Sequence, residues 1–177
     1  MFSDLRPQID LLDGFPAVLW ALVVGLTDDA LRWRPSENDW AIIEILRHLY
    51  DEEREDFRPR LQSTLFNADD SWAPIDPVGW AAERKYLRAD LDSTLDGFQR
   101  ERTLSVGWLR ELADVDLNVA HEHPSLGTIR AGDLLAAWIA HDQLHLRQIA
   151  RRRFQIVERA LAPFSTRYAG EWPTPAG

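Results

Sequence analysis

The sequence predicts an all-α fold, a helical bundle that occupies residues 1–177 as one domain. Four segments carry apolar residues at the three- and four-residue spacing of helices. No segment shows the alternating pattern of strands bounded by hairpin turns. With 177 residues, of which 45% are apolar, the chain can bury one core of ordinary size.

The first helix is expected at about residues 7–26. Pro7 suits the first turn of a helix, where the missing N–H of proline is not needed. Gly14 and Pro16 lie in the middle of the segment, so we expect a kink or a split at that point.

The second and third helices are expected on either side of a long connection. Asn38 or Asp39 can cap the second helix, which should reach about Arg58. Prolines and several Asp and Ser residues at positions 67–79 predict a loop. The third helix should follow at residues 80–112, either continuous or broken once.

The fourth helix is expected at residues 131–154, after a turn at residues 123–128. Residues 163–177 are rich in Pro, Gly and Thr, so we expect an irregular C-terminal tail there. The tail can dock through its aromatic side chains, which are Phe164, Tyr168 and Trp172.

Composition excludes several classes of function. The chain has no cysteine, so thiolate nucleophiles and iron–sulfur sites are excluded, and any metal must use nitrogen and oxygen ligands. The formal net charge of -9 disfavours nucleic acid as a partner, because the basic cluster at residues 151–153 is too small to reverse it. No apolar run approaches the roughly 20 residues of a membrane span, and no secretory signal is evident. We therefore expect a cytoplasmic protein without a membrane partner.

Three of the five histidines are expected on the buried faces of two helices. A helical projection aligns His48 with Ile45, and it aligns His141 and His145 with Trp138. Residues four apart lie one turn apart on the same face, so His141 and His145 can reach one ion, with His48 as the third ligand. Three neutral imidazoles leave a coordination position open, which is typical of reactive metal sites.

The ligand set does not decide which divalent metal binds. Zinc or nickel is expected first, with iron, manganese or copper as alternatives. The competing interpretation is that the three histidines are hydrogen-bonded core residues, but three inward ring N–H groups then need partners. Asp142 stands where the zinc-protease motif has its glutamate, so a metalloprotease is disfavoured.

Two acidic residues near His48 are the candidates for a catalytic role. Glu52 lies one turn after His48 and can be a fourth ligand, a partner for an imidazole N–H, or a base that acts on water. A solvated acid near the helix end is an equally good interpretation of Glu52. Glu53 lies on the apolar flank, where a salt bridge to another helix is the alternative. The sequence does not rank the two acids.

Other polar residues are also expected near the core. Asp142 can orient a ligand histidine, although an interhelical ion pair explains it equally well. Arg102 aligns with apolar residues and can bind an anionic substrate near the ion, but we favour a buried pair with an acid such as Glu53. His121 and His123 are expected to be turn or capping residues, with a His-x-His metal site as the alternative.

Three stretches resemble the DinB/YfiT-like superfamily: residues 40–49, 123–127 and 141–149. The first contains His48, and the last begins with His141 and includes His145. The resemblance extends over residues 11–153. It implies a four-helix bundle with a long crossover connection, a divalent metal held by these three histidines, and a homodimer.

The resemblance also implies a range of activities. Characterised members include S-transferases and an isomerase that use low-molecular-weight thiols such as bacillithiol or mycothiol. The first hypothesis is therefore metal-dependent transfer of such a thiol to a small electrophile. The second is a metal-dependent hydrolase with Glu52 or Glu53 as the base, and the third is a non-catalytic stress-response or binding protein that the metal stabilises.

Overall fold

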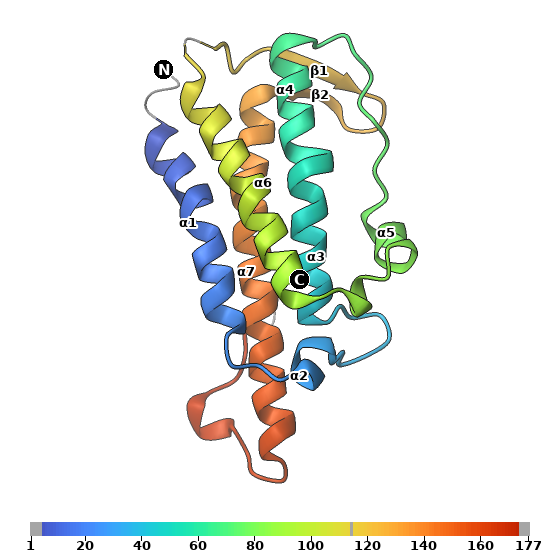
Figure 1. Cartoon of the computed structure of the whole chain (residues 1–177), viewed down its shortest axis with the longest axis vertical. Helices are drawn as coiled ribbons and strands as arrows, with labels where there is room; N and C mark the ends of the chain where they lie inside the picture. The colour runs from blue at the N-terminus through green and yellow to red at the C-terminus, as the bar shows by residue number, and fades with distance from the viewer. Residues whose placement is uncertain (1–4, 114, 174–177) are drawn as a thin grey trace.

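The computed structural model describes residues 5–113 and 115–173. Its long helices run side by side along the long axis of the molecule (Figure 1). The helices are α1 (Arg6–Val23), α2 (Asp28–Arg32), α3 (Ile42–Glu52), α4 (Arg58–Phe66), α5 (Pro77–Glu83), α6 (Leu91–Glu111) and α7 (Ala131–Leu161). The predicted all-α bundle is confirmed. None of the described helices has the length and apolar character that crossing a membrane requires.

The first helix is continuous, so the expected split is wrong. Pro16 lies inside α1 and is buried. A proline cannot donate to the carbonyl four residues earlier, which is that of Leu12. Instead, Nη1 of Arg102 on α6 donates to the Leu12 carbonyl oxygen at 3.1 Å. The guanidinium thus replaces the partner that the proline removes.

The second helix begins later than expected. It starts at Ile42, after Ala41 in an extended conformation. The Glu44 carboxylate accepts the Ala41 N–H at 2.9 Å and so satisfies a donor at the helix start. Of the two expected caps, Asp39 pairs instead with Arg152 of α7 at 3.0 Å.

A π-helical turn, η2 (Glu53–Phe57), joins α3 to α4. The helical segment therefore continues past its expected end at Arg58 and ends at Phe66. A π turn inserts one residue into the helical register and rotates the residues that follow it. Pro59 lies in the first turn of α4, where its missing N–H is tolerated.

The third expected helix is divided. The chain forms α5, then a short 3-10 turn η3 (Tyr86–Arg88), and then α6. Lys85 separates the first two with a φ of 53°, which is left-handed. The Asp90 side chain caps α6 by accepting the Ser93 N–H at 2.9 Å.

Two strands form a hairpin that was not expected. They are β1 (Ala120–His123) and β2 (Gly127–Arg130), paired antiparallel with His123 opposite Gly127. Gly127 has a φ of 74°, which glycine adopts without strain. Each strand has only four residues, and alternation over so short a stretch gives little signal.

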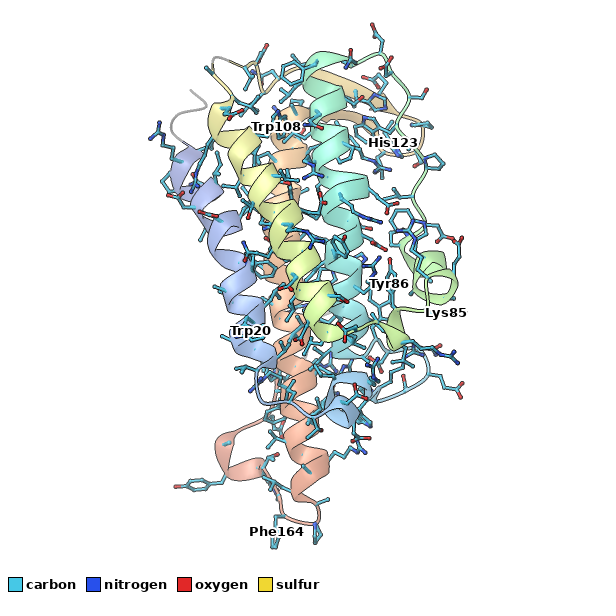
Figure 2. The ribbon with its side chains drawn as sticks, in the orientation of Figure 1. Trp20, Lys85, Tyr86, Trp108, His123 and Phe164 are labelled. Carbon is cyan, nitrogen blue, oxygen red and sulfur yellow. The ribbon has the colours of Figure 1, made fainter. Side chains whose placement is uncertain are left out.

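The fourth helix ends at Leu161 instead of near Phe154. The tail then returns along α7 and places the Trp172 ring 5.6 Å from that of Phe154. Trp172 therefore docks as expected, whereas Phe164 and Tyr168 are exposed (Figure 2 labels Phe164). Residues 174–177 of the expected tail lie outside the described residues.

The core consists of two apolar clusters. One contains Phe15, Leu19, Ile45, Leu49, Phe98 and Ile149 among others. The second contains Ile9, Leu12, Leu61, Val106, Leu134 and Trp138 among others. Along α6 and α7, and along the continuous path from α3 through η2 to α4, buried polar residues stand between members of the two clusters. These residues are Glu52, Glu53, Arg102 and Asp142.

Candidate metal centre

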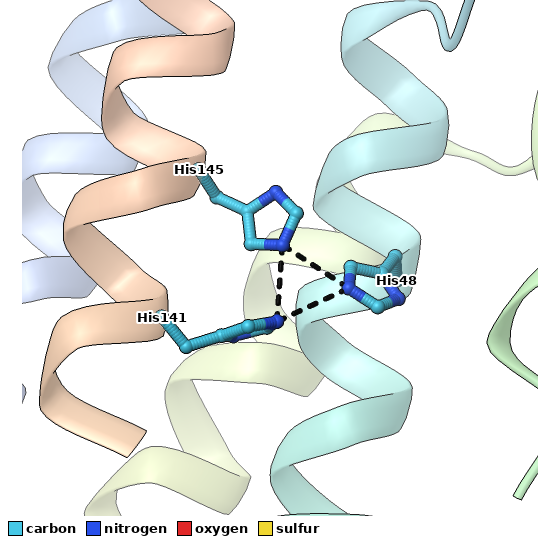
Figure 3. A group of neighbouring side chains, drawn as sticks. All are labelled: His48, His141 and His145. Atoms are coloured by element: carbon cyan, nitrogen blue, oxygen red, sulfur yellow. Dashed lines mark hydrogen bonds between the residues drawn. The ribbon is translucent and has the colours of Figure 1, made fainter. Parts of the chain in front are cut away.

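The three predicted ligands converge on one point. His48 comes from α3, and His141 and His145 come from α7 (Figure 3). The Nε2 atoms are 3.3 Å apart for His48 and His141, 3.1 Å for His48 and His145, and 3.0 Å for His141 and His145. Nitrogen ligands about 2.0–2.1 Å from one tetrahedral ion lie about 3.3 Å from one another. The spacing fits a single small divalent ion. Among the described residues, no carboxylate belongs to this group.

Hydrogen bonds among the imidazoles cannot pair all three Nε2 atoms with one another. Nδ1 of His145 lies 2.7 Å from Oε1 of Gln148, and an amide oxygen only accepts. Nδ1 therefore carries the proton, and Nε2 of His145 presents a lone pair. Each Nε2 atom is either a hydrogen-bond donor or an acceptor. Among three such atoms, at least two are of the same kind, so at least one of the three contacts joins two donors or two acceptors. A bound cation would satisfy all three nitrogens.

Burial keeps the imidazoles neutral. It lowers the pKa of His48 to about 3, with repulsion from His145 as the second cause. Burial, the other two imidazoles and the Arg102 cation together lower the pKa of His141 to about 2. Burial also lowers the pKa of His145. Neutral imidazole is the form that binds a metal, so the site is ready to bind at pH 7.

Aromatic rings enclose two of the three histidines. The Trp40 ring packs edge-on against His48 with centroids 5.0 Å apart. The Phe57 ring lies 4.9 Å from that of His141 and stacks on Trp138. These contacts restrict rotation of both imidazoles. Phe57 ends the π turn η2, so this irregular turn helps to build the site.

Glu52 lies behind His48. Its Oε1 is 3.7 Å from Nδ1 of His48, whereas the other two histidines approach Nε2 of the same ring. Both of these facing atoms are buried and lack a hydrogen-bond partner. Burial raises the pKa of Glu52 to about 8, and the neighbouring Asp56 adds to this effect. Glu52 therefore lies on the Nδ1 side of His48, beyond hydrogen-bond distance, and its predicted role as a partner for the imidazole N–H stays a prediction. The solvated-acid interpretation is wrong, because Glu52 is 4% exposed.

Arg102 forms a buried network beside the triad. Its Nη2 lies 2.9 Å from Oε2 of Glu53, and both its terminal nitrogens donate to Asp142. The same Oε2 of Glu53 accepts the Trp138 indole N–H at 2.9 Å. The predicted pairing of Arg102 with Glu53 is confirmed. With 1% of Arg102 exposed, its alternative role in binding an anionic substrate is not supported.

Both acids of this network form buried ion pairs with Arg102. Glu53 forms the salt bridge that was predicted as the alternative to a catalytic role, and its catalytic role stays a prediction. Asp142 is held by Arg102, as the ion-pair interpretation expects, and not by a ligand histidine. Burial raises the pKa of Asp142 to about 6, although the Arg102 cation acts in the opposite direction.

His121 and His123 lie on the hairpin, away from the triad. Nδ1 of His121 is 3.0 Å from the Ala68 carbonyl oxygen. Nδ1 of His123 accepts two backbone N–H groups of the turn, at 3.2 and 3.1 Å. The predicted turn and capping role is confirmed for His123, whereas it is wrong for His121, which lies in β1 and contacts the Ala68 carbonyl of the distant connection after α4. Among the described residues, these two histidines join no metal-binding group.

Gln148 is the site residue that the sequence reasoning missed. Its position three residues after His145 on α7 was an available signal, since side chains at that spacing are neighbours on a helix. The π turn left no comparable signal, because no residue type marks it.

Comparison with known proteins agrees with this fold. A sequence model of the DinB superfamily matches residues 11–149. A protein of Oceanobacillus iheyensis, described as a candidate metal-dependent hydrolase, is 24% identical over 146 residues, which cover 82% of this chain and 83% of the relative. The solved structure of Bacillus subtilis YfiT has a TM-score of 0.77 and 22% identity, covering 85% of this chain and 86% of YfiT. YfiT is described as a candidate metal-dependent hydrolase with an unusual four-helix-bundle topology.

Proposed function

Because this chain belongs to the DinB superfamily, we propose that it is a metal-dependent hydrolase whose single divalent ion is held by His48, His141 and His145. The observation that carries the proposal is the convergence of three imidazole nitrogens without a carboxylate among them. Three protein ligands leave a position for water or substrate. The two relatives described as candidate hydrolases support this reaction class.

The surrounding residues prepare the site in distinct ways. A divalent ion bound there would supply Lewis acidity, which activates water toward an ester or amide carbonyl at neutral pH. Gln148 holds the proton of His145 on Nδ1 and so directs the Nε2 lone pair inward. Glu52 stands at Nδ1 of His48 and favours the corresponding orientation of that ring. Trp40 limits rotation of the same imidazole.

Transfer of a low-molecular-weight thiol to an electrophile stays a prediction. An open metal position suits a sulfur ligand as well as water. Hydrolysis is placed first because both relatives are described as candidate hydrolases. The two reactions are distinguished by thiol consumption, since transfer uses one thiol for each electrophile and hydrolysis uses none.

The first test measures metal content and turnover together. Purified protein should contain about one equivalent of divalent metal, and His145→Ala should lose it. The metal-loaded protein should hydrolyse members of a panel of esters and amides, and both chelation and His145→Ala should abolish the turnover. Equal metal content in the two proteins would refute the site. Metal binding without hydrolysis would refute the reaction and leave thiol transfer or a non-catalytic role.

The role of Glu52 is tested separately. If Glu52 orients His48, Glu52→Leu should weaken metal affinity by about 10- to 100-fold, and Glu52→Gln, which keeps an acceptor, should weaken it less. The exposed Glu83 on α5 provides the control Glu83→Gln. If Glu52 were the catalytic base, both substitutions at position 52 would instead abolish turnover with metal affinity unchanged.

A further inference from the structure

A cavity of about 290 Å³ lies beside the triad. Its walls come from one face of α7 and from the returning tail: Leu144, His145, Arg147, Gln148, Arg151, Trp172 and Pro173. His145 belongs both to this cavity and to the three-histidine group. A ligand in the cavity would therefore contact His145, one of the three histidines of the triad.

The cavity is positive in an acidic chain. The formal net charge is -9, yet none of the seven lining residues is acidic and two are arginines. Arg147 and Arg151 are four residues apart on α7, so they lie one turn apart on the same face. Nearby Arg152 pairs with Asp39, whereas no ion pair engages either cavity arginine in the part of the chain that the structure describes. Both guanidinium groups are thus available to an anion.

The remaining lining residues define the rest of the ligand. Gln148 uses its amide oxygen for His145, so its amino group is left as a donor. Leu144, which is 58% exposed, lines the cavity from α7, and Trp172 lines it from the tail. The site thus combines cations, one amide donor and an apolar wall. An adjoining hollow shares Arg151 with the cavity and also contains Arg167, Glu158 and Glu171, so its charges balance, and the excess of positive charge lies in the part near His145.

We propose that this cavity binds the oxyanion of the substrate, a carboxylate or phosphate on an apolar body, through Arg147 and Arg151. The substrate's body packs against Leu144 and Trp172, and its reactive bond lies toward His145. This inference rests on the proposed hydrolase function and assigns its substrate class. Arginine suits the role because its planar fork donates two parallel hydrogen bonds to carboxylate or phosphate.

The binding test uses the metal-loaded full chain and a matched pair of probes. 3-Phenylpropanoate is the anion, and 3-phenylpropanamide is its neutral counterpart. By calorimetry we expect the anion to bind at least about tenfold more tightly, because each charge-assisted hydrogen bond contributes about tenfold. The double variant Arg147→Gln/Arg151→Gln should lose most of this preference. Direct binding of the carboxylate to the ion is common to both proteins, so the difference reports the arginines.

Two controls separate charge from position. The double variant Arg88→Gln/Arg100→Gln changes the net charge equally at exposed positions outside the cavity, and it should keep the preference. Trp172→Ala should weaken both probes by a similar factor, because it removes apolar wall and no charge. An equal loss of preference in both double variants, or no preference in the unmodified protein, would overturn the proposal. Phenyl phosphate in the same assay decides between carboxylate and phosphate as the preferred oxyanion.

A hydrolysis assay distinguishes failure of this inference from failure of the proposed function. The substrates are the mono-4-nitrophenyl ester of glutaric acid, which is anionic, and 4-nitrophenyl pentanoate, which is neutral and of equal length. Arginine-dependent preference for the glutarate ester supports both ideas. Hydrolysis of both esters with equal kcat/KM in all variants would overturn the oxyanion site and keep the hydrolase. Arginine-dependent anion binding without any hydrolysis would overturn the hydrolase and keep the oxyanion site as a binding site.

Discussion

Replacing Arg102 with Met removes the cation from the space that it shares with Glu53 and Asp142, with little change in side-chain length. The guanidinium lies 2.9 Å from Glu53 and 3.0 Å from one oxygen of Asp142, and it donates to the Leu12 carbonyl at 3.1 Å. Loss of one partner from a buried ion pair costs about 3–5 kcal/mol. The carbonyl left without a donor adds about 1 kcal/mol.

The expected total for Arg102→Met is about 4–6 kcal/mol, since the two acids share one cation and can take up protons. For a chain of this length, that loss lowers the midpoint of thermal unfolding by roughly 10–20 °C. Urea and thermal unfolding followed by far-ultraviolet circular dichroism measure it. Arg110→Met is the control, because Arg110 pairs with Asp10 and Asp13 at the surface and should cost less than about 1 kcal/mol. Equal losses in the two variants would refute the reasoning.

The same variant has an expected pH dependence. Burial already raises the pKa of Asp142 to about 6, and removal of Arg102 should raise it further. A carboxyl group with a higher pKa in the folded state binds protons there that the unfolded state has released, so stability falls as the pH rises through that range. The deficit of Arg102→Met should therefore be smaller at about pH 5 than at about pH 8. A deficit independent of pH would contradict the assignment.

Three further predictions concern packing, ligand orientation and metal binding. Gly97→Ala should destabilise the protein by about 1–3 kcal/mol in urea unfolding, because the new Cβ would lie 2.8 Å from the Tyr50 ring. Gly107→Ala, on the same helix with open space around it, should stabilise by about 0.5–1 kcal/mol, and the same sign for both would count against the packing. Gln148→Leu should weaken metal affinity about tenfold in chelator competition, and Gln148→Glu, which keeps an acceptor for His145, should largely restore it. Metal at about 100 times its Kd should add about 2.7 kcal/mol of stability in the same unfolding assay, and His145→Ala should show no such gain.

Helical periodicity was sufficient to predict that the three histidines lie together. His48, His141 and His145 occupy the apolar stripes of two helices, and burial of a stripe fixes where its members point. The pairing of Arg102 with Glu53 was also predictable, since a cation within an apolar stripe requires an acid nearby.

What the sequence did not show depends on contacts between segments or on backbone register. The π turn changes only which carbonyl each N–H meets, and Glu53–Phe57 consists of three acids, one arginine and one phenylalanine, none of which marks such a turn. The late start of α3 depends on Glu44 as a cap, a role for which Asn38 and Asp39 offered stronger local signals. The hydrogen bond from Gln148 to His145 requires a rotamer that spacing alone does not specify.

Arg102 donates a hydrogen bond to the Leu12 carbonyl, which Pro16 leaves without a helical partner. The effects of substitutions at Pro16 and Arg102 on stability are therefore coupled. Pro16→Ala restores an N–H that can return the Leu12 carbonyl to the helix, and this substitution should make the loss of Arg102 less harmful. In a double-mutant cycle, the combined substitution Pro16→Ala/Arg102→Met should then cost less than the sum of its parts by about 0.5–1 kcal/mol. A residue usually regarded as a helix breaker would thus determine how much damage a change in a distant core arginine causes.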